Sequence, residues 1–345
     1  MNLHLRITTC AIALAAAAGA EPRYGTILLG EHHYLVAERD LPYPYVSAPW
    51  TDGATTLVLS IGSRPEFPSM LVQHYGRWGE PSHELAPVVA ATRVIGFPYA
   101  AHRNGVSVVT WRDGAGAAPV RGQLFEVSGV PRAAAFDVFN GLSQVSPACG
   151  LGGGRVAFAA EADSAGGHGM FLRVFDLLGS PLQDGQMVSR SRLDEPGIVQ
   201  WVIPFVLDDG AILLVYVLES TAPATEFSLN FRRVEPDGEV GQRVMLAPFG
   251  TGYYRISQLS DGSLTYFYQT EPFGTVGTMS RVDQFGQMLG SPTPIASDYY
   301  YGTAAPDGRF ALTFRPCCFS VQAQLFDATG QATSERFEFH LGPPP

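Results

Sequence analysis

Hydrophobic and polar residues alternate over short runs in the C-terminal part of the chain. Between residues 307 and 339, three such runs, RFALTF, VQAQLF and RFEF, are separated by the turn sequences Asp307-Gly308 and Asp327-Ala328-Thr329-Gly330. Alternation with a period of two, bounded by Gly and Asp, is typical of antiparallel strands joined by tight turns. The pattern therefore predicts three strands here, and the same pattern recurs five times upstream.

Two series of glycines mark this repeat, both with a spacing of about 50 residues. The first series opens each unit after Asp, Asn or Gly, at Gly53, Gly105, Gly154, Gly210, Gly262 and Gly308. The second lies in a D-x-x-G-like turn, at Gly79, Gly129, Gly179, Gly238, Gly286 and Gly330. Hairpin turns need a residue at positive φ, which glycine adopts without a Cβ clash.

A repeat of about 50 residues that holds short strands is typical of a β-propeller blade and not of a helical solenoid. We therefore predict an all-β fold, a six-bladed β-propeller of four-stranded blades that closes as a ring over residues 43–345. A seven-bladed propeller is the alternative, if residues 21–42 help to build a further blade. The runs GTILLG and HYLVAER in that segment could instead form a hairpin outside the ring.

The first 20 residues read as a signal peptide. Arg6 precedes the apolar run ITTCAIALAAAA, and Ala18-Gly19-Ala20 offers small residues for cleavage after Ala20. We expect a Sec-exported protein, secreted or periplasmic, without a membrane anchor because no later run reaches the length of a membrane span.

Composition narrows the range of partners. At 345 residues, 46% hydrophobic and 16% charged, the chain can bury a large core, and we expect a monomer. All 22 basic residues are arginine and the net charge is −10, so the basic surface that nucleic-acid binding requires is not expected.

The first strand of each blade lines the tunnel of a propeller, and we place these strands at residues 43–50, 93–100, 143–150, 197–206, 252–259 and 299–306. They contain no Asp or Glu, and their only charged residues are Arg93 and Arg255. Propellers that hydrolyse lactones or esters hold a metal there with carboxylates, because hard cations prefer anionic oxygen ligands. We therefore expect no metal and no cofactor.

The repeat D-G-x-F followed by L-F-D-x-x-G resembles the tandem propeller repeats of secreted and surface proteins of proteobacteria. The resemblance covers residues 43–340 and is strongest in the last unit. It implies export and a propeller fold. Because a scaffold and not a catalytic motif defines that family, the resemblance implies almost nothing about chemistry.

Recognised catalytic motifs are missing from the chain. The Asp-box of sialidases, S-x-D-x-G-x-T-W, is absent from all six copies, and G-x-S-x-G, H-E-x-x-H, C-x-x-C and a phosphate loop are absent too. This favours a non-catalytic binding or structural module for a glycan, a peptide or an envelope protein. The alternative is a secreted hydrolase or lyase, sialidase-like or otherwise, that uses loop residues.

Carboxylates follow the second strands of the units and would lie on the face where propellers usually bind ligands. They are Glu66, Asp113, Glu161, Asp163, Glu219 and Glu271. Solvated loop charge is the simpler interpretation of this set.

Tyrosines give the candidate binding site. Seven of the 14 fall at the starts of the first strands of units one, five and six, which ring closure makes neighbours: Tyr43, Tyr45, Tyr253, Tyr254, Tyr299, Tyr300 and Tyr301. Their rings could stack against a sugar or an extended peptide, with Arg315 in the same sector. The alternative is that they plug the tunnel. In the neighbouring loop, Cys317 and Cys318 form either a vicinal disulfide or two free thiols, and Cys149 is too far across the ring to bridge to them.

Overall fold

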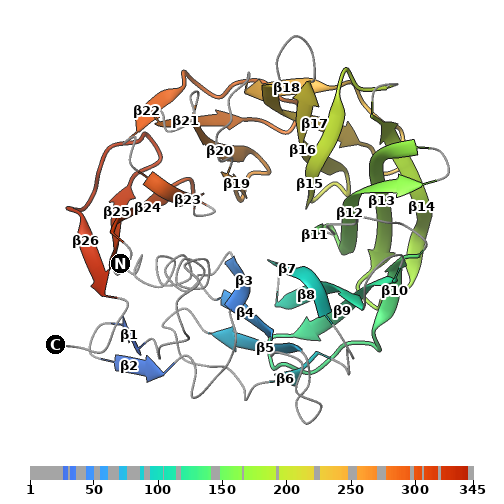
Figure 1. The fold of residues 1–345 in the computed structure, drawn as a ribbon, viewed down its shortest axis with the longest axis horizontal. Coiled ribbons are helices and arrows are strands. Elements are labelled where there is room, and N and C mark those ends of the chain that lie inside the picture. Colours follow the sequence, from blue (N-terminus) through green and yellow to red (C-terminus); the bar gives the residue numbers. More distant parts are fainter. Residues whose placement is uncertain are drawn as a thin grey trace. The chain divides into compact units, whose positions relative to one another are not determined.

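The computed structural model describes residues 26–29, 32–35, 44–49, 55–60, 70–75, 86–88, 94–103, 105–113, 118–140, 148–164, 167–191, 194–220, 226–247, 255–269, 277–295, 299–304, 307–317 and 320–340 (Figure 1). The predicted signal peptide and its cleavage site lie outside these residues. Every regular element among the described residues is a strand. No helix long and apolar enough to cross a membrane is found among them.

Among the described residues, six antiparallel sheets have four strands each, in strict up-and-down order. The first holds β3 (Pro44–Pro49), β4 (Thr55–Ser60), β5 (Met70–Tyr75) and β6 (Ala86–Pro87). The second holds β7 (Val94–Arg103), β8 (Val106–Asp113), β9 (Val120–Glu126) and β10 (Phe136–Phe139). The third holds β11 (Ala148–Gly152), β12 (Arg155–Ser164), β13 (Gly167–Asp176) and β14 (Pro181–Arg190).

The remaining three sheets repeat this order. The fourth holds β15 (Ile198–Val206), β16 (Ile212–Ser220), β17 (Glu226–Val234) and β18 (Val244–Ala247). The fifth holds β19 (Arg255–Gln258), β20 (Leu264–Gln269), β21 (Gly277–Val282) and β22 (Thr293–Ile295). The sixth holds β23 (Tyr299–Ala304), β24 (Phe310–Cys317), β25 (Ser320–Phe326) and β26 (Phe337–His340). Strands β1 (Thr26–Leu29) and β2 (His32–Leu35) form a separate two-stranded sheet.

The repeating glycines stand where the sequence predicts tight turns. In the described part of the chain, every member of both series has a positive φ, at Gly105, Gly129, Gly154, Gly179, Gly210, Gly238, Gly262, Gly286, Gly308 and Gly330. In the third sheet, for example, the Gly179 N–H donates to the Asp176 carbonyl at 3.2 Å and closes the β13–β14 turn. The glycines therefore set the ends of the strands, as expected for residues at positive φ.

Alternation along each strand sends side chains into two different cores. In β12, Val156, Phe158, Ala160 and Ala162 pack toward β7–β10, whereas Ala157 and Ala159 pack toward β15–β18. A sheet that is covered on both faces needs apolar residues at successive positions, which explains the nearly continuous hydrophobic run of β16, ILLVYVLES. This is the arrangement of stacked blades.

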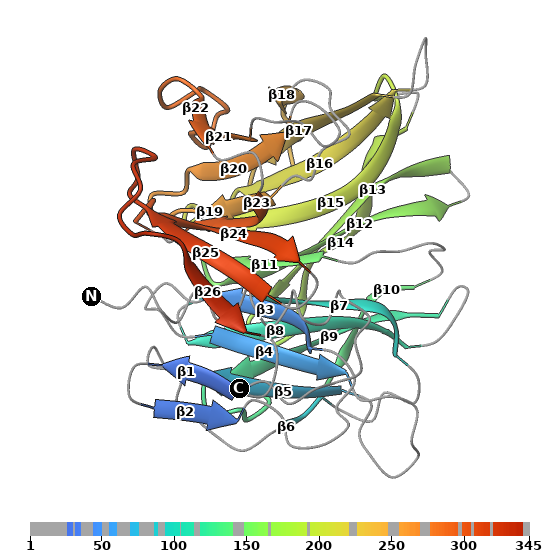
Figure 2. The same cartoon turned by 60° about the vertical axis from the view of Figure 1, so that its left-hand side comes forward.

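The chain divides into two compact units. Met1–Leu59, Tyr75–Pro81 and Gly250–Pro345 form the first unit, and Ser60–His74 and Ser82–Phe249 form the second. Within the second unit the first strands of three sheets, β7, β11 and β15, lie side by side, and each sheet continues outward to β10, β14 or β18 (Figures 1 and 2). Within the first unit β19 lies beside β23, where the Ala304 N–H donates to Ser257 Oγ at 3.0 Å.

One detail refines the sequence-based boundaries. Strand β7 continues to Arg103, three residues beyond the predicted end, because Arg103 pairs with Val106 around the hairpin turn at Gly105. The boundaries at residues 20 and 42, the closure of the ring and the number of blades remain predictions.

Candidate functional site

Strand topology brings the ends of two hairpins and the start of a strand together in the second unit. Strand β12 ends at Ser164 and β13 begins at Gly167, while β16 ends at Ser220 beside Glu226 of β17. Strand β15 starts at the same end, because Ile198 pairs with Glu219 and His168 bonds to Val199. We call the group Asp163, His168, Val199, Gln200 and Glu219 the hairpin end.

A histidine is held rigidly at the hairpin end. Asp163 and His168 face each other across the β12–β13 hairpin, with 2.9 Å between His168 Nδ1 and Asp163 Oδ1. The other ring nitrogen, Nε2, lies 2.8 Å from the carbonyl oxygen of Val199 on the next sheet. Both ring nitrogens thus face oxygen atoms, which hold the ring from two sides. The side chain of His168 is 26% exposed and that of Asp163 is 45% exposed, so solvent reaches the pair.

A second polar pair, Gln200 and Glu219, lies on the face of the β15–β18 sheet that points away from β11–β14. Gln200 Nε2 donates to Glu219 Oε2 at 2.7 Å across strands β15 and β16. Val199 and Leu218, which alternate with these two residues, point toward β11–β14 and belong to the core between the two sheets. The carboxylates of Asp163 and Glu219 are therefore at the same end of neighbouring sheets but on different faces.

In the connection from β14 to β15 the structure describes residues 191 and 194–197, which contact both pairs, and we call these residues the strap. At its start the Ser191 N–H donates to the His168 carbonyl at 2.9 Å, and Ser191 Oγ accepts from the Val199 N–H at 2.9 Å. At its end Gly197 lies so close to the backbone oxygen of Glu219 that a Cβ would collide with it. The strap therefore contacts both the histidine pair and the end of β16.

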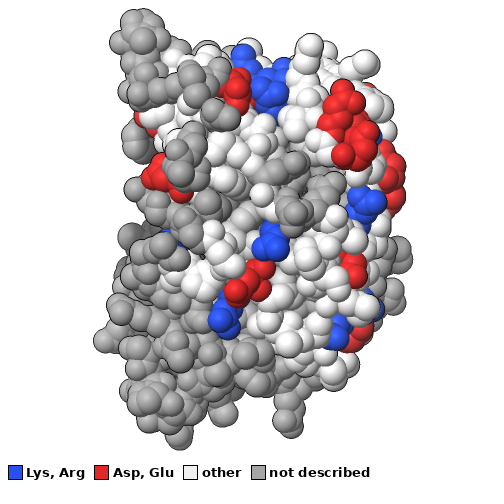
Figure 3. All heavy atoms as spheres, turned by 90° about the vertical axis from the view of Figure 1, so that its right-hand side faces the viewer, with Lys and Arg blue, Asp and Glu red and all other residues white. Residues whose placement is uncertain are grey.

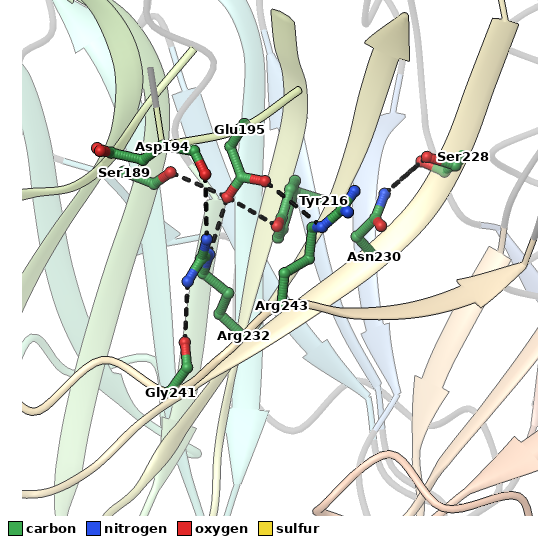
Figure 4. Close-up of polar contacts among 9 residues, drawn as sticks. All are labelled: Ser189, Asp194, Glu195, Tyr216, Ser228, Asn230, Arg232, Gly241 and Arg243. Atoms are coloured by element: carbon green, nitrogen blue, oxygen red, sulfur yellow. Dashed lines mark hydrogen bonds and ion pairs between the residues drawn. The ribbon is translucent and has the colours of Figure 1, made fainter. Parts of the chain in front are cut away.

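Glu195 anchors the middle of the strap in the protein interior (Figure 4). Its Oε1 accepts three hydrogen bonds, from Ser189 Oγ at 2.9 Å, Tyr216 OH at 2.9 Å and Arg232 Nε at 2.8 Å. Its Oε2 lies 3.9 Å from Arg243 Nε. The Glu195 side chain is fully buried, so its charge depends on these partners instead of water.

Glu195 and its partners Ser189, Tyr216, Arg232 and Arg243, which we call the anchor, include two groups with altered pKa values. Burial, and after it the negative charge of Glu195, raise the pKa of the Tyr216 phenol above its ordinary value, so Tyr216 remains a hydrogen-bond donor. Burial alone would lower the pKa of Arg232, but the hydrogen bond and the charge of Glu195 outweigh it and raise that pKa. Arg232 also donates to the Gly241 carbonyl at 2.9 Å, which holds its guanidinium in place.

The anchor contains the residue types of a sialidase centre, a tyrosine paired with an acid and arginines, but it lies between two sheets. Tyr216 is 0% exposed and Glu195 is 2% exposed. A substrate cannot contact either group without separating the sheets. The anchor is thus a structural element, and the exposed chemistry belongs to the hairpin end.

Surface charge is mixed on the face that Figure 3 shows. Arginines and acidic residues lie in small neighbouring groups among the atoms that are not grey. The ion pairs of the second unit include Arg233–Asp209 at 2.7 Å and Arg132–Glu126 at 2.9 Å. On this face the described arginines form no extended basic area that could follow a phosphate backbone.

The tyrosines of the predicted binding site are placed only in part. Tyr45 lies in β3, and Tyr299, Tyr300 and Tyr301 lie in β23, next to β24, which carries Arg315 and Cys317. Tyr299 pairs with Phe314, so these tyrosines and Arg315 lie at one end of the sixth sheet. Their side chains, together with Tyr43, Tyr253, Tyr254 and Cys318, lie outside the described residues. The tyrosine site and the vicinal disulfide therefore stay predictions, whereas Cys149 is a buried free thiol.

The loop carboxylates of the sequence analysis are strand residues where the structure describes them. Glu161 and Asp163 lie in β12, Glu219 in β16 and Asp113 at the end of β8, while Glu66 and Glu271 lie outside the described residues. No motif in the sequence marks His168 or Glu195. The one signal for the Asp163–His168 pair is their separation of five residues, which places them opposite each other if β12 and β13 form a tight hairpin. Among the described residues no group of three or more His, Cys, Asp or Glu side chains could hold a metal.

The β-propeller class is defined by four-stranded up-and-down sheets that pack face to face, with their first strands side by side. The comparison with solved structures agrees with this class. No protein-family profile matches the chain, and no curated protein sequence is significantly similar to it. Among solved structures, a PL25 polysaccharide lyase, an ulvan lyase bound to -[GlcA(1-4)Rha3S]-, aligns with a TM-score of 0.50 at 9% identity, over 92% of this chain and 86% of its own.

Two further structures align over most of their length. The α-L-arabinanase of Penicillium chrysogenum in complex with arabinobiose has a TM-score of 0.50 at 12% identity, over 93% of this chain and 99% of its own. AofleA from Arthrobotrys oligospora has a TM-score of 0.52 at 11% identity, over 87% and 88%. At such low identity these similarities show the β-propeller fold alone.

Proposed function

We propose that this chain is a glycan-active β-propeller whose second unit presents its reactive groups at the hairpin end. The observation that carries the proposal is the solvent-accessible Asp163–His168 pair, which the Val199 carbonyl holds in one orientation. The names of two propellers with the same fold, a polysaccharide lyase and an arabinanase, support it. They favour the hydrolase or lyase alternative more than the non-catalytic module that the sequence favours.

Charge separates two kinds of glycan chemistry. A lyase of uronate-containing polysaccharides acts on a polyanion, and a protein with a net charge of −10 repels a polyanion at long range. Hydrolysis of a neutral glycan meets no such repulsion. It requires a proton donor and a base or nucleophile placed around the glycosidic bond. In this proposal the Asp163–His168 pair takes one of these two roles.

A non-catalytic glycan-binding propeller is the second candidate. The specific feature that favours it is the placement of Asp163 and Glu219 on different faces of the sheets, since one bond must be reached by both groups in a hydrolase. In both cases the predicted signal peptide would deliver the protein to the periplasm or the medium, where polysaccharides occur.

A panel of polysaccharides distinguishes the two. The mature protein is incubated with neutral glycans, among them arabinan, and with uronate-containing polyanions. Reducing ends report hydrolysis, the ultraviolet absorbance of unsaturated products reports elimination, and affinity electrophoresis reports binding. We expect new reducing ends from a neutral glycan, and a rate reduced by about 100-fold or more in Asp163→Asn and His168→Gln.

Glu235→Gln is the matched control, because Glu235 forms an ion pair with Arg233 beyond the opposite end of β17 and should leave the rate unchanged. Retarded migration in glycan-containing gels without cleavage would identify the binding module. The proposal fails if no polysaccharide is cleaved or bound, or if the two hairpin-end variants behave like the unaltered protein.

A further inference from the structure

The strap joins a buried charge to an exposed pair within a few residues. Glu195 sits in the interior, while Ser191 and Val199 on either side of it make the hydrogen bonds that reach His168. A parallel bridge between Ser191 and Glu195 keeps the backbone of the strap folded back on itself. A movement of Glu195 would therefore shift Ser191 and Val199 and, through their hydrogen bonds, His168.

We propose that Glu195 is a positioning residue, whose buried carboxylate sets the strap and thereby the orientation of the His168 ring. The contacts of Glu195 span two sheets: Ser189 belongs to β14, whereas Tyr216 and Arg232 belong to β16 and β17. The strap is therefore fixed relative to both sheets, and so is the Val199 carbonyl that accepts from His168 Nε2. Only the significance of His168 as a reactive group rests on the proposed function.

The negative charge of Glu195, and not only its size, is what holds the strap. Three donors converge on Oε1, and a cationic guanidinium lies on each side, Arg232 at 2.8 Å and Arg243 at 3.9 Å from the two carboxylate oxygens. Charge-assisted hydrogen bonds of this kind are shorter and stronger than neutral ones. A glutamine has the same shape but would turn an NH₂ group toward one of the two arginines.

The test compares Glu195→Gln with a protein that is destabilised elsewhere. Leu312→Ala is the control, because Leu312 is buried in the core between β19–β22 and β23–β26 of the first unit and its loss leaves a cavity far along the chain from the strap. Both variants are first shown to be folded by near-ultraviolet circular dichroism. The readouts are the ring nitrogen signals of ¹⁵N-histidine-labelled protein, with His168 assigned through His168→Gln, and trypsin cleavage after Arg190 and Arg192.

In Glu195→Gln we expect the Nε2–H signal of His168 to shift or to exchange away, and cleavage after Arg190 or Arg192 to accelerate by about tenfold, as for local opening of one segment. In Leu312→Ala the His168 signals should match those of the unaltered protein, and cleavage should follow global unfolding. An unchanged His168 signal in folded Glu195→Gln would overturn the proposal.

Two milder variants decide the question if Glu195→Gln does not fold. Tyr216→Phe and Ser189→Ala each remove one donor to Oε1 and leave the ion pair with Arg232 intact. The same change at His168, reduced in size, supports the proposal, and unchanged signals in both variants refute it. Neither readout needs a glycan, so a failure of the proposed glycan activity leaves this result standing, and the reverse also holds.

Discussion

At the scale of single residues, Glu195 illustrates how a buried charge is tolerated. A carboxylate without water is stable only when donors and an opposite charge replace the solvent, and Ser189, Tyr216 and Arg232 supply them. Burying such a pair contributes little net stability, but removing one partner typically costs about 3–5 kcal/mol because the other charge is left uncompensated. The ion pair therefore ties the strap to one position more than it stabilises the protein as a whole.

Aspartates of the D-x-x-G turns use the same physics at the surface. Asp176 Oδ1 accepts from the N–H groups of Leu178 and Ser180, both at 2.8 Å. Asp327 Oδ1 accepts from the Thr329 hydroxyl at 2.7 Å and from two backbone N–H groups. These bonds favour the charged form, so the Ser180 N–H lowers the pKa of Asp176 and the Thr329 hydroxyl, followed by the Gln331 N–H, lowers that of Asp327.

Substituting either aspartate should make the protein less stable only where the carboxyl is charged. The pKa in the folded protein lies below the ordinary 3.8, so the stabilisation is fully present above that pH and is lost as the pH falls through the folded pKa. Urea unfolding of Asp176→Asn and Asp327→Asn should show a lower midpoint than the unaltered protein near neutral pH. The difference should disappear in strong acid, and a difference that persists there would contradict the assignment to charge.

At the scale of elements, the strap shows how a connection between sheets acquires a fixed path. Glycine at position 197 allows the chain to pass directly against the Glu219 backbone, and Glu195 then points into the interior. Gly197 is needed here for space and not for a positive φ, unlike the turn glycines. One small residue thus brings the strap to the end of β16 and completes the hairpin end.

Gly197→Ala tests this close approach. The added methyl group collides with a backbone oxygen that cannot move without disturbing β16, so we expect a loss of about 1–3 kcal/mol in the free energy of unfolding. Gly185→Ala in β14 is the matched control, because a Cβ there meets only the Arg173 side chain at an ordinary 3.6 Å. Equal unfolding midpoints for the two variants would show that the strap has room to shift.

At the scale of the whole molecule, packing on both faces of a sheet supplies stability, as the cores on the two faces of β11–β14 show. The core between β7–β10 and β11–β14 contains Val108, Leu124, Phe158 and Phe175, and Phe136 packs edge-on against Phe158 at 5.9 Å. Cys149 belongs to this core. Its burial raises the pKa of the thiol far above the ordinary value, so the reactive thiolate is scarce even where reagent could enter.

Alkylation of Cys149 should therefore report the separation of these sheets. In native buffer, we expect iodoacetamide to leave Cys149 unmodified, and the rate to rise with urea in parallel with the unfolding transition. Peptide mass mapping distinguishes Cys149 from Cys317 and Cys318 and shows in the same experiment whether the latter two alkylate without reductant. Fast modification of Cys149 in the folded protein would mean that this core opens locally.

The sequence by itself determined the local elements. Alternating runs between Asp-Gly and D-x-x-G turns predict strands within a few residues of those observed, and the glycines predict the turns, because period-two alternation and positive φ are properties of neighbouring residues. The all-β propeller class follows from the spacing of those turns, and the comparison with solved structures confirms it.

Only the tertiary structure decided which distant side chains meet. His168 reaches the Val199 carbonyl across 31 positions, and Glu195 meets Arg232 across 37. In the sequence these residues look like ordinary strand and loop residues, since no pattern of neighbours marks a partner on another sheet. Their meeting depends on how one sheet is stacked on the next, and this is set by the summed packing of both faces instead of by any local run.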